Sequence, residues 1–232
     1  MGYVEREEAA QGGALLRLSR PPVNALWIDL LAELVGALEQ ELVAGTRAIV
    51  LTGAGSCFSA GIDTKAAAGA NAEELASGVT AINRTVSTLF GLPIPVVCAL
   101  NGHALGGGLV IPLACDLIVA TRTPCRIGLT EVSAGVPFPA VALVAVRARL
   151  SPPVFNNLCL TGRVFGPEEA LELGVADELC DADELIDRSV AVAAELASFP
   201  AYARVKEQVR APQLDEMPEL AERDPMLGRW ID

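Results

Sequence analysis

The sequence is poor in aromatic residues, in histidine and in positive charge. Aromatic side chains make up 4% of the 232 residues, and His103 is the single histidine. The 29 Asp and Glu outnumber the 17 Lys and Arg, which gives a formal net charge of −12. A protein that binds a nucleic-acid backbone needs clustered Lys and Arg to displace counterions, and the sequence has no such cluster. We therefore exclude nucleic acid as the main partner.

Metal-ligand and membrane-spanning patterns are missing as well. The six cysteines are scattered, without a CxxC pair or other ligand spacing, so we expect no metal site and reduced, buried thiols. Pro, Gly or charge interrupts every apolar stretch before about 18 residues, too short for a transmembrane helix. The first residues are polar and acidic, unlike a signal peptide. We expect a cytoplasmic protein without a membrane partner.

Apolar residues, by contrast, make up 52% of the chain, enough for a sizeable core. Up to about residue 137, short apolar strands alternate with amphipathic segments of helical period, which is typical of an α/β fold. Beyond it the pattern predicts helices, and we expect the acidic, proline-interrupted tail from Ala211 to pack loosely. The expected strands are 14–19, 47–52, 95–100 and 116–121, and the expected helices are 28–42, 73–90, a short buried one at 109–115, 139–150, 152–160, 167–173, 182–197 and 201–209.

Two glycine-rich loops carry the first functional signal. TGAGSCFSAGID (52–63) and NGHALGGGL (101–109) each follow a buried strand and lead into a predicted helix. Glycine allows close backbone approach, so the two loops can aim N–H groups at one oxygen atom. Each donor aimed at developing negative charge is worth about 2.7–4 kcal/mol in a transition state. The alternative for each loop alone is an ordinary strand-to-helix turn.

Neither loop fits a phosphate-binding motif. The dinucleotide fingerprint that begins at Gly53 would need a third glycine where Phe58 stands. The P-loop spacing that begins at Gly102 ends in Gly108 and Leu109, where Lys and Ser or Thr are required. The sequence therefore gives little support for nucleotide binding by either loop.

Taken together, five segments in order resemble the crotonase, or enoyl-CoA hydratase/isomerase, superfamily. The resemblance implies a ββα spiral core over residues 1–175 and a helical C-terminal region over residues 176–232 that supports a homotrimer or a dimer of trimers. It also implies an acyl-CoA thioester substrate, with coenzyme A as part of that substrate and no separate cofactor. The matching segments are SRPPVNAL (19–26), IVLTGAGSCFSAGID (49–63), ALNGHALGGGLVIPLACDLIVAT (99–121), IGLTEVSAGVPFP (127–139) and LTGRVFGPEEALELGVADEL (160–179).

By motif position, the resemblance places the backbone N–H groups of Ala60 and Gly107 around the thioester oxygen. A basic residue common in the family near the CoA entrance is missing, and we expect Arg20 and Lys65 to compensate. The CoA contacts implied by the family map to Val23, Ala25, Gly61, Ile62, Asp63 and Thr64.

The acid/base groups decide which reaction follows. Hydratases of the family use two glutamates that share a water, and this chain has Val110 at the first position and Glu131 at the second. Moving a double bond from the 3,4 to the 2,3 position needs only one base, best with a pKa raised toward neutrality. We expect Val110, Val132, Val136 and Phe138 to supply the apolar surroundings of Glu131. The sequence thus favours a Δ3,Δ2-enoyl-CoA isomerase.

Two alternatives remain open. A hydratase, thioesterase or C–C hydrolase would need a second group, for which Glu73 and Glu74 are the candidates. A non-catalytic acyl-CoA-binding protein would follow if Glu131 pointed away from the cavity. We interpret the other reactive residues as structural: Asp63 and Asp116 as cap or turn residues, His103 as a packed neutral imidazole, and Cys57, Trp27 and Trp230 as packing or assembly residues.

Overall fold

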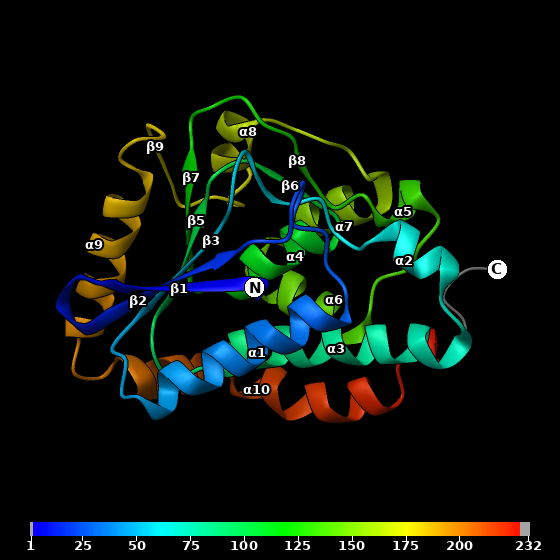
Figure 1. Cartoon of the computed structure of the whole chain (residues 1–232), viewed down its shortest axis with the longest axis horizontal. Helices are drawn as coiled ribbons and strands as arrows, with labels where there is room; N and C mark the ends of the chain where they lie inside the picture. The colour runs from blue at the N-terminus through cyan, green and yellow to red at the C-terminus, as the bar shows by residue number, and fades with distance from the viewer. Residues whose placement is uncertain (1, 228–232) are drawn as a thin grey trace.

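A six-stranded sheet runs through the molecule and is the base on which the helices pack (Figure 1). The computed structural model describes residues 2–227. The order is β1-β2-β3-β5-β7-β9, with β1 antiparallel to β2 and every later pair parallel. This confirms the expected α/β class. The strands are β1 (Val4–Ala9), β2 (Gly13–Leu18), β3 (Ile49–Gly53), β5 (Val96–Leu100), β7 (Leu117–Thr121) and β9 (Glu178–Cys180).

A second, three-stranded parallel sheet lies within the two glycine loops and the segment after β7. It consists of β4 (Cys57–Ser59), β6 (His103–Leu105) and β8 (Ile127–Gly128), in that order. Strands β4 and β6 were expected to be loop, because three residues are too few to show a period-2 pattern. This sheet fixes the two glycine loops side by side.

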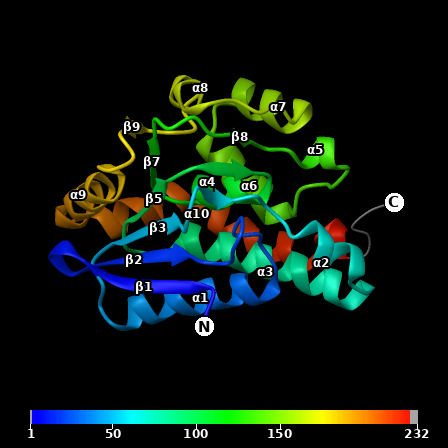
Figure 2. The same ribbon diagram turned by 45° about the horizontal axis from the view of Figure 1, so that its top comes forward.

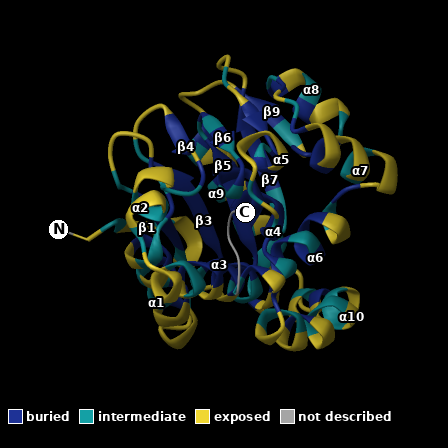
Figure 3. Cartoon of the chain, turned by 90° about the vertical axis from the view of Figure 1, so that its right-hand side faces the viewer, coloured by how far each residue is buried: buried dark blue, intermediate teal, exposed yellow. Residues whose placement is uncertain are grey.

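Helices cover both faces of the large sheet. Side chains of β2, β3, β5 and β7 form one apolar cluster with α9, whereas the larger cluster joins the opposite face to the other helices (Figures 1 and 2). The buried surfaces of strands and helices meet in the interior, and the exposed residues lie on the outer helix faces (Figure 3). The helices are α1 (Ile28–Val43), α2 (Thr64–Gly69), α3 (Ala72–Gly91), α4 (Gly107–Ala114), α5 (Glu131–Ala134), α6 (Ala140–Arg149), α7 (Pro152–Thr161), α8 (Pro167–Glu172), α9 (Leu185–Ser198) and α10 (Tyr202–Glu222), with single turns η1 (Ala10–Gly12) and η2 (Pro225–Leu227).

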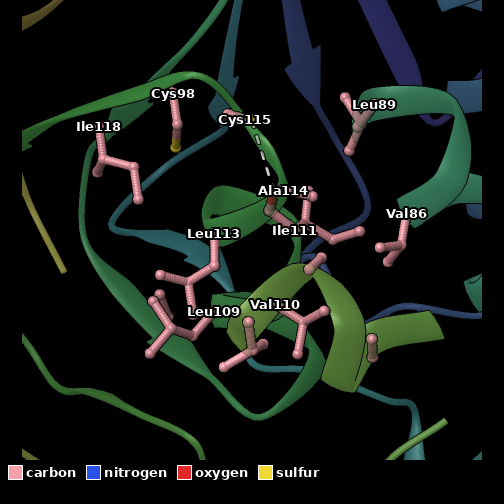
Figure 4. Close-up of a cluster of buried hydrophobic side chains, with 14 of the residues drawn as sticks. Val86, Leu89, Cys98, Leu109, Val110, Ile111, Leu113, Ala114, Cys115 and Ile118 are labelled. Carbon is pink, nitrogen blue, oxygen red and sulfur yellow. Dashed lines mark hydrogen bonds between the residues drawn. The ribbon is translucent and has the colours of Figure 1, made fainter. Parts of the chain in front are cut away.

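Helix α4 is buried on every side, as its uniformly apolar sequence predicts. Figure 4 shows Leu109, Val110, Ile111 and Leu113 leaving the helix in different directions, each into neighbouring side chains. The Cys115 thiol just after the helix donates to the Ile111 carbonyl at 3.5 Å. Because α4 has no solvent face, its first residue, Gly107, is fixed by the core itself.

The tail corrects one expectation. The segment after Ala211 was expected to be loose, yet α10 continues through Pro212 and Pro218 to Glu222. Met217 is 2% exposed and joins the main core, so burial on the packed face outweighs the missing proline hydrogen bonds. Trp230 lies outside the described residues.

Two strands of the large sheet were not predicted. β1 (VEREEA) is an edge strand whose central residues are exposed. Its sequence therefore lacks the alternation of apolar and polar residues that would predict a strand. β9 lies after residue 175, in the part for which the sequence predicts only helices, and it completes the sheet against β7. The division into a core and a C-terminal helical region stays a prediction. Within residues 2–227 no helix combines the length and apolarity that crossing a membrane requires.

A buried ionic cluster joins α10 to the sheet. Asp116 accepts from the Lys206 ammonium at 2.8 Å and from the Val96 N–H at 2.7 Å, and its Oδ1 forms an ion pair with Arg210 Nη2 at 2.9 Å. The side chains of Asp116, Lys206 and Arg210 are 8%, 7% and 13% exposed, and burial lowers the pKa of Lys206. The sequence predicted a cap or turn residue here. Asp116 is instead the shared anion for two buried cations.

We predict that Asp116→Asn destabilises the protein by about 3–5 kcal/mol, because removing one partner leaves buried charge uncompensated. Urea unfolding measures the change. The control is Glu39→Gln, which removes the exposed Arg84–Glu39 pair and should cost less than about 1 kcal/mol. Equal effects of the two substitutions would contradict this account of the cluster.

Candidate active site

The first glycine loop pairs with the segment that precedes α1. The Leu26 N–H donates to the Gly61 carbonyl at 2.8 Å, and the Asp63 N–H donates to the Leu26 carbonyl at 2.9 Å. The Ser59 hydroxyl donates to the Asn24 carbonyl at 2.7 Å. The two stretches that the family resemblance assigns to CoA, Val23–Ala25 and Gly61–Thr64, therefore lie side by side at one rim.

This pairing corrects the assignment of the first donor. The N–H of Ala60 donates to the Val23 carbonyl at 3.0 Å and is therefore already used inside the protein. Across residues 2–227, no backbone acceptor is found for the N–H of Ile62, whose neighbours Gly61 and Asp63 make the contacts to Leu26. Motif position alone does not reveal which amide the pairing uses. The available N–H of this loop is that of Ile62.

The second N–H group that the resemblance selects is that of Gly107. Gly107 is the first residue of α4, so its N–H lies in the first turn, which has no acceptor within the helix. A Cβ on Gly61 would lie 2.5 Å from the Leu105 carbonyl oxygen and 3.4 Å from the Gly107 nitrogen. Gly61 also has a φ of +86°, which favours glycine. The two loops thus touch backbone to backbone, next to both N–H groups.

Glu131 lies beside these donors, at the start of α5. It is 8% exposed, and a Cβ on Gly106 would lie 3.5 Å from its Oε1 atom. Its Oε2 atom is buried and has no hydrogen-bond partner among the described residues. Burial raises the pKa of Glu131 to about 7, against a smaller lowering by its own backbone N–H. A carboxylate with these properties is suited to take up and release a proton near neutral pH.

A cavity of about 280 Å³ connects these groups. Among the described side chains that line it, Glu131 is the one carboxylate, and the hydroxyls of Thr64 and Thr130 are the other polar groups. Of the residues implied by the resemblance, Ala60, Gly61, Ile62, Thr64, Gly107 and Glu131 line the cavity, whereas Val23, Ala25 and Asp63 do not.

The apolar surroundings of Glu131 are partly those expected. Val110 and Val136 line the cavity, together with Pro137 and Pro139. Val132 does not line it: its side chain is 49% exposed, because α5 presents it to the outside. Phe138 packs against the main core instead of the cavity.

The candidate second carboxylates serve another purpose. Glu74 accepts from the N–H of Asn71 at 2.8 Å, while the Asn71 side chain accepts from the N–H groups of Glu73 and Glu74. This capping box begins α3 and satisfies its free amides. Both glutamates are exposed, and neither lines the cavity.

Asp63 and Arg20 form a structural pair. Asp63 caps α2, since its Oδ1 accepts from the N–H groups of Lys65 and Ala66 at 3.2 and 3.0 Å, as predicted. Its Oδ2 lies 2.8 Å from Arg20 Nη1, and the Ala66 and Arg20 contacts lower the pKa of Asp63. Arg20 also donates to the Ala25 carbonyl at 2.8 Å. Arg20 therefore fixes the rim and is not a free cation for CoA phosphates.

His103 and Cys57 contribute no acid or nucleophile to the cavity. His103 Nδ1 accepts from the Arg126 N–H at 2.9 Å, which leaves that nitrogen unprotonated, and the ring is not part of the lining. Burial raises the pKa of the Cys57 thiol to about 11, and the thiol donates to the His103 carbonyl. These contacts agree with structural roles for both residues.

Comparison with known proteins identifies the family. A family model described as enoyl-CoA hydratase/isomerase matches residues 8–228. The probable enoyl-CoA hydratase EchA17 of Mycobacterium tuberculosis is 32% identical over 196 residues, which cover 83% of this chain and 74% of that protein. The chain therefore belongs to the enoyl-CoA hydratase/isomerase family, within the crotonase superfamily.

Solved structures share the fold. The probable enoyl-CoA hydratase EchA3 of Mycobacterium tuberculosis superimposes with a TM-score of 0.89 at 26% identity, covering 95% of this chain and 93% of that one. Human mitochondrial Δ3-Δ2-enoyl-CoA isomerase superimposes with a TM-score of 0.90 at 24% identity, covering 97% and 90%. At that identity the second likeness concerns the fold alone.

We predict that Glu131→Gln stabilises the protein more at pH 8 than at pH 4.5. Its folded pKa of about 7 lies above the ordinary 4.5, so the protonated form favours folding below pH 4.5 and this contribution is lost as pH rises through 7. At about 1.36 kcal/mol per unit, ionisation costs on the order of 3 kcal/mol that Gln avoids. Thermal unfolding at both pH values measures this difference in stability, with the exposed Glu172→Gln as control. A pH-independent difference would show that Glu131 titrates normally.

Proposed function

We propose that the protein isomerises 3-enoyl-CoA thioesters to 2-enoyl-CoA, with Glu131 as the single base. The observation that carries this proposal is the cavity lining: one carboxylate with a raised pKa stands beside two backbone donors, and Val110 occupies the position at which hydratases of the family have their first glutamate. Relatives that are named hydratases show that the family contains that activity too. The single described carboxylate of the cavity lining supports isomerisation.

The oxyanion site consists of the N–H groups of Ile62 and Gly107. The thioester oxygen accepts from both, and α4 adds the positive end of its dipole through Gly107. These donors stabilise the enolate oxygen more strongly than the neutral carbonyl, because negative charge develops there only on the way to the intermediate. The CoA portion leaves the cavity over the paired rim at Val23–Ala25.

Glu131 performs both proton transfers. As the carboxylate it removes a proton from C2, and the electrons of the broken C–H bond delocalise into the adjacent thioester carbonyl, onto its oxygen, and through the C3–C4 double bond onto C4. The same carboxyl then returns the proton at C4, which leaves the double bond between C2 and C3. The apolar walls at Val110 and Val136 favour the neutral acid that exists between the two steps.

Among the described residues that line the cavity, no second acid/base group is present for the addition of water. A hydratase must activate a water and also deliver a proton, and Thr64 and Thr130 hydroxyls are weak bases at neutral pH. The described lining holds no imidazole, thiol or amine that could replace the missing carboxylate. We therefore place hydration well below isomerisation in rate.

We predict that purified protein converts 3-hexenoyl-CoA to the conjugated 2-enoyl product, and that Glu131→Gln lowers kcat at least about 100-fold, the lower range for a positioned acid/base group. For the wild type, kcat/KM should fall below about pH 7, because protonation removes the base. Absorbance of the conjugated thioester follows the reaction.

The control for this test is Glu172→Gln, an exposed carboxylate on α8. It should retain wild-type kcat. Hydration of 2-hexenoyl-CoA at a rate equal to isomerisation would favour the hydratase instead. Tight binding of both thioesters without turnover would favour a binding protein.

A further inference from the structure

The C-terminal turn η2 returns to the acyl cavity. Every other described lining residue comes from the chain between Ala60 and Ala142, whereas Met226 follows α10. Its side chain is 3% exposed and belongs to the main apolar core. The neighbouring wall is apolar and includes Ile82 of α3 and Pro139 and Ala142 at the start of α6. Met226 is therefore part of a hydrocarbon-lined section of the cavity.

Asp224 holds this turn in place. It is 3% exposed, and its Oδ2 accepts from the Asn83 side-chain amide at 2.8 Å and from the Ala140 N–H at 2.7 Å. Its Oδ1 accepts from the N–H of Met226 at 2.9 Å. One buried carboxylate thus links α3, the first residue of α6 and η2. The same two helices supply the wall next to Met226.

The size of the cavity limits what fits beside the catalytic groups. The cavity measures about 280 Å³, and Met226 forms part of its apolar wall. A longer acyl chain must displace part of the wall, and the Met226 side chain is the unbranched, adaptable member of that wall.

We propose that Met226, fixed by Asp224, closes the acyl cavity and restricts the substrate to short acyl chains. The inference rests on the proposed acyl-CoA function and adds a specificity-determining residue from a segment far from the donor loops. Substituting Ala removes everything beyond Cβ and opens the cavity at its apolar wall. Substituting Phe shortens the usable space.

The test measures binding, so that it does not depend on turnover. Calorimetry gives the Kd of hexanoyl-CoA and dodecanoyl-CoA for the wild type, Met226→Ala and Met226→Phe. We expect the wild type to prefer the short chain, and Met226→Ala to shift the ratio of the two affinities at least about 10-fold toward dodecanoyl-CoA, the scale for methylene groups that gain or lose a pocket. Met226→Phe should shift it the other way.

The matched control is Met217→Ala, a buried methionine of the same apolar core that does not line the cavity. It should lower the melting temperature yet leave the affinity ratio unchanged. Asp224→Asn should shift the ratio in the direction of Met226→Ala. The proposal is overturned if the ratio stays the same in Met226→Ala, or if Met217→Ala shifts it equally.

The failure of the proposed function would be recognised separately. A wild type that binds neither thioester overturns both proposals. If the ratio of the two affinities shifts as expected but the protein has no isomerase activity, the role of Met226 stands and the proposed reaction is wrong.

Discussion

The close backbone contact between the two glycine loops determines the rest of the site. A side chain at Gly61 would collide with the Leu105 carbonyl, and one at Gly108 would collide with the Ser59 carbonyl. Only residues without a Cβ let strands β4 and β6 approach in this way. The contact brings the N–H groups of Ile62 and Gly107 next to Glu131. The positions of these two N–H groups beside Glu131 therefore depend on glycine.

The apolar core holds these groups in place and sets the electrostatic surroundings of Glu131. Helix α4 has no solvent face, so Gly107 has little freedom to move, and Val110 on the same helix forms part of the wall. The low-dielectric surroundings that bury Glu131 also raise its pKa to about 7. The buried charges of Asp116, Lys206 and Arg210 lie apart from the cavity lining and stabilise the attachment of α10. The buried ion pairs that stabilise the fold are thus separate from the carboxyl group that lines the cavity.

Long elements could be predicted from the sequence, and short-range detail could not. The amphipathic period of α1 and the apolar runs of β3, β5 and β7 predict those elements, and motif position selects Gly107 and Glu131, which both line the cavity. The choice between the Ala60 and Ile62 amides depends on a pairing with Val23 and Leu26 that no local pattern encodes. The contribution of Met226 to the cavity likewise depends on how the tail folds back.

In the proposed reaction, one carboxyl group carries the proton from C2 to C4. The most direct measurement is a single turnover of 3-hexenoyl-CoA labelled with deuterium at C2, in ordinary water, with mass-spectrometric analysis of the product. A buried Glu131 exchanges slowly with solvent, so part of the label should appear at C4 of 2-hexenoyl-CoA. A product without any label at C4, or one with a hydroxyl group at C3, would contradict the account.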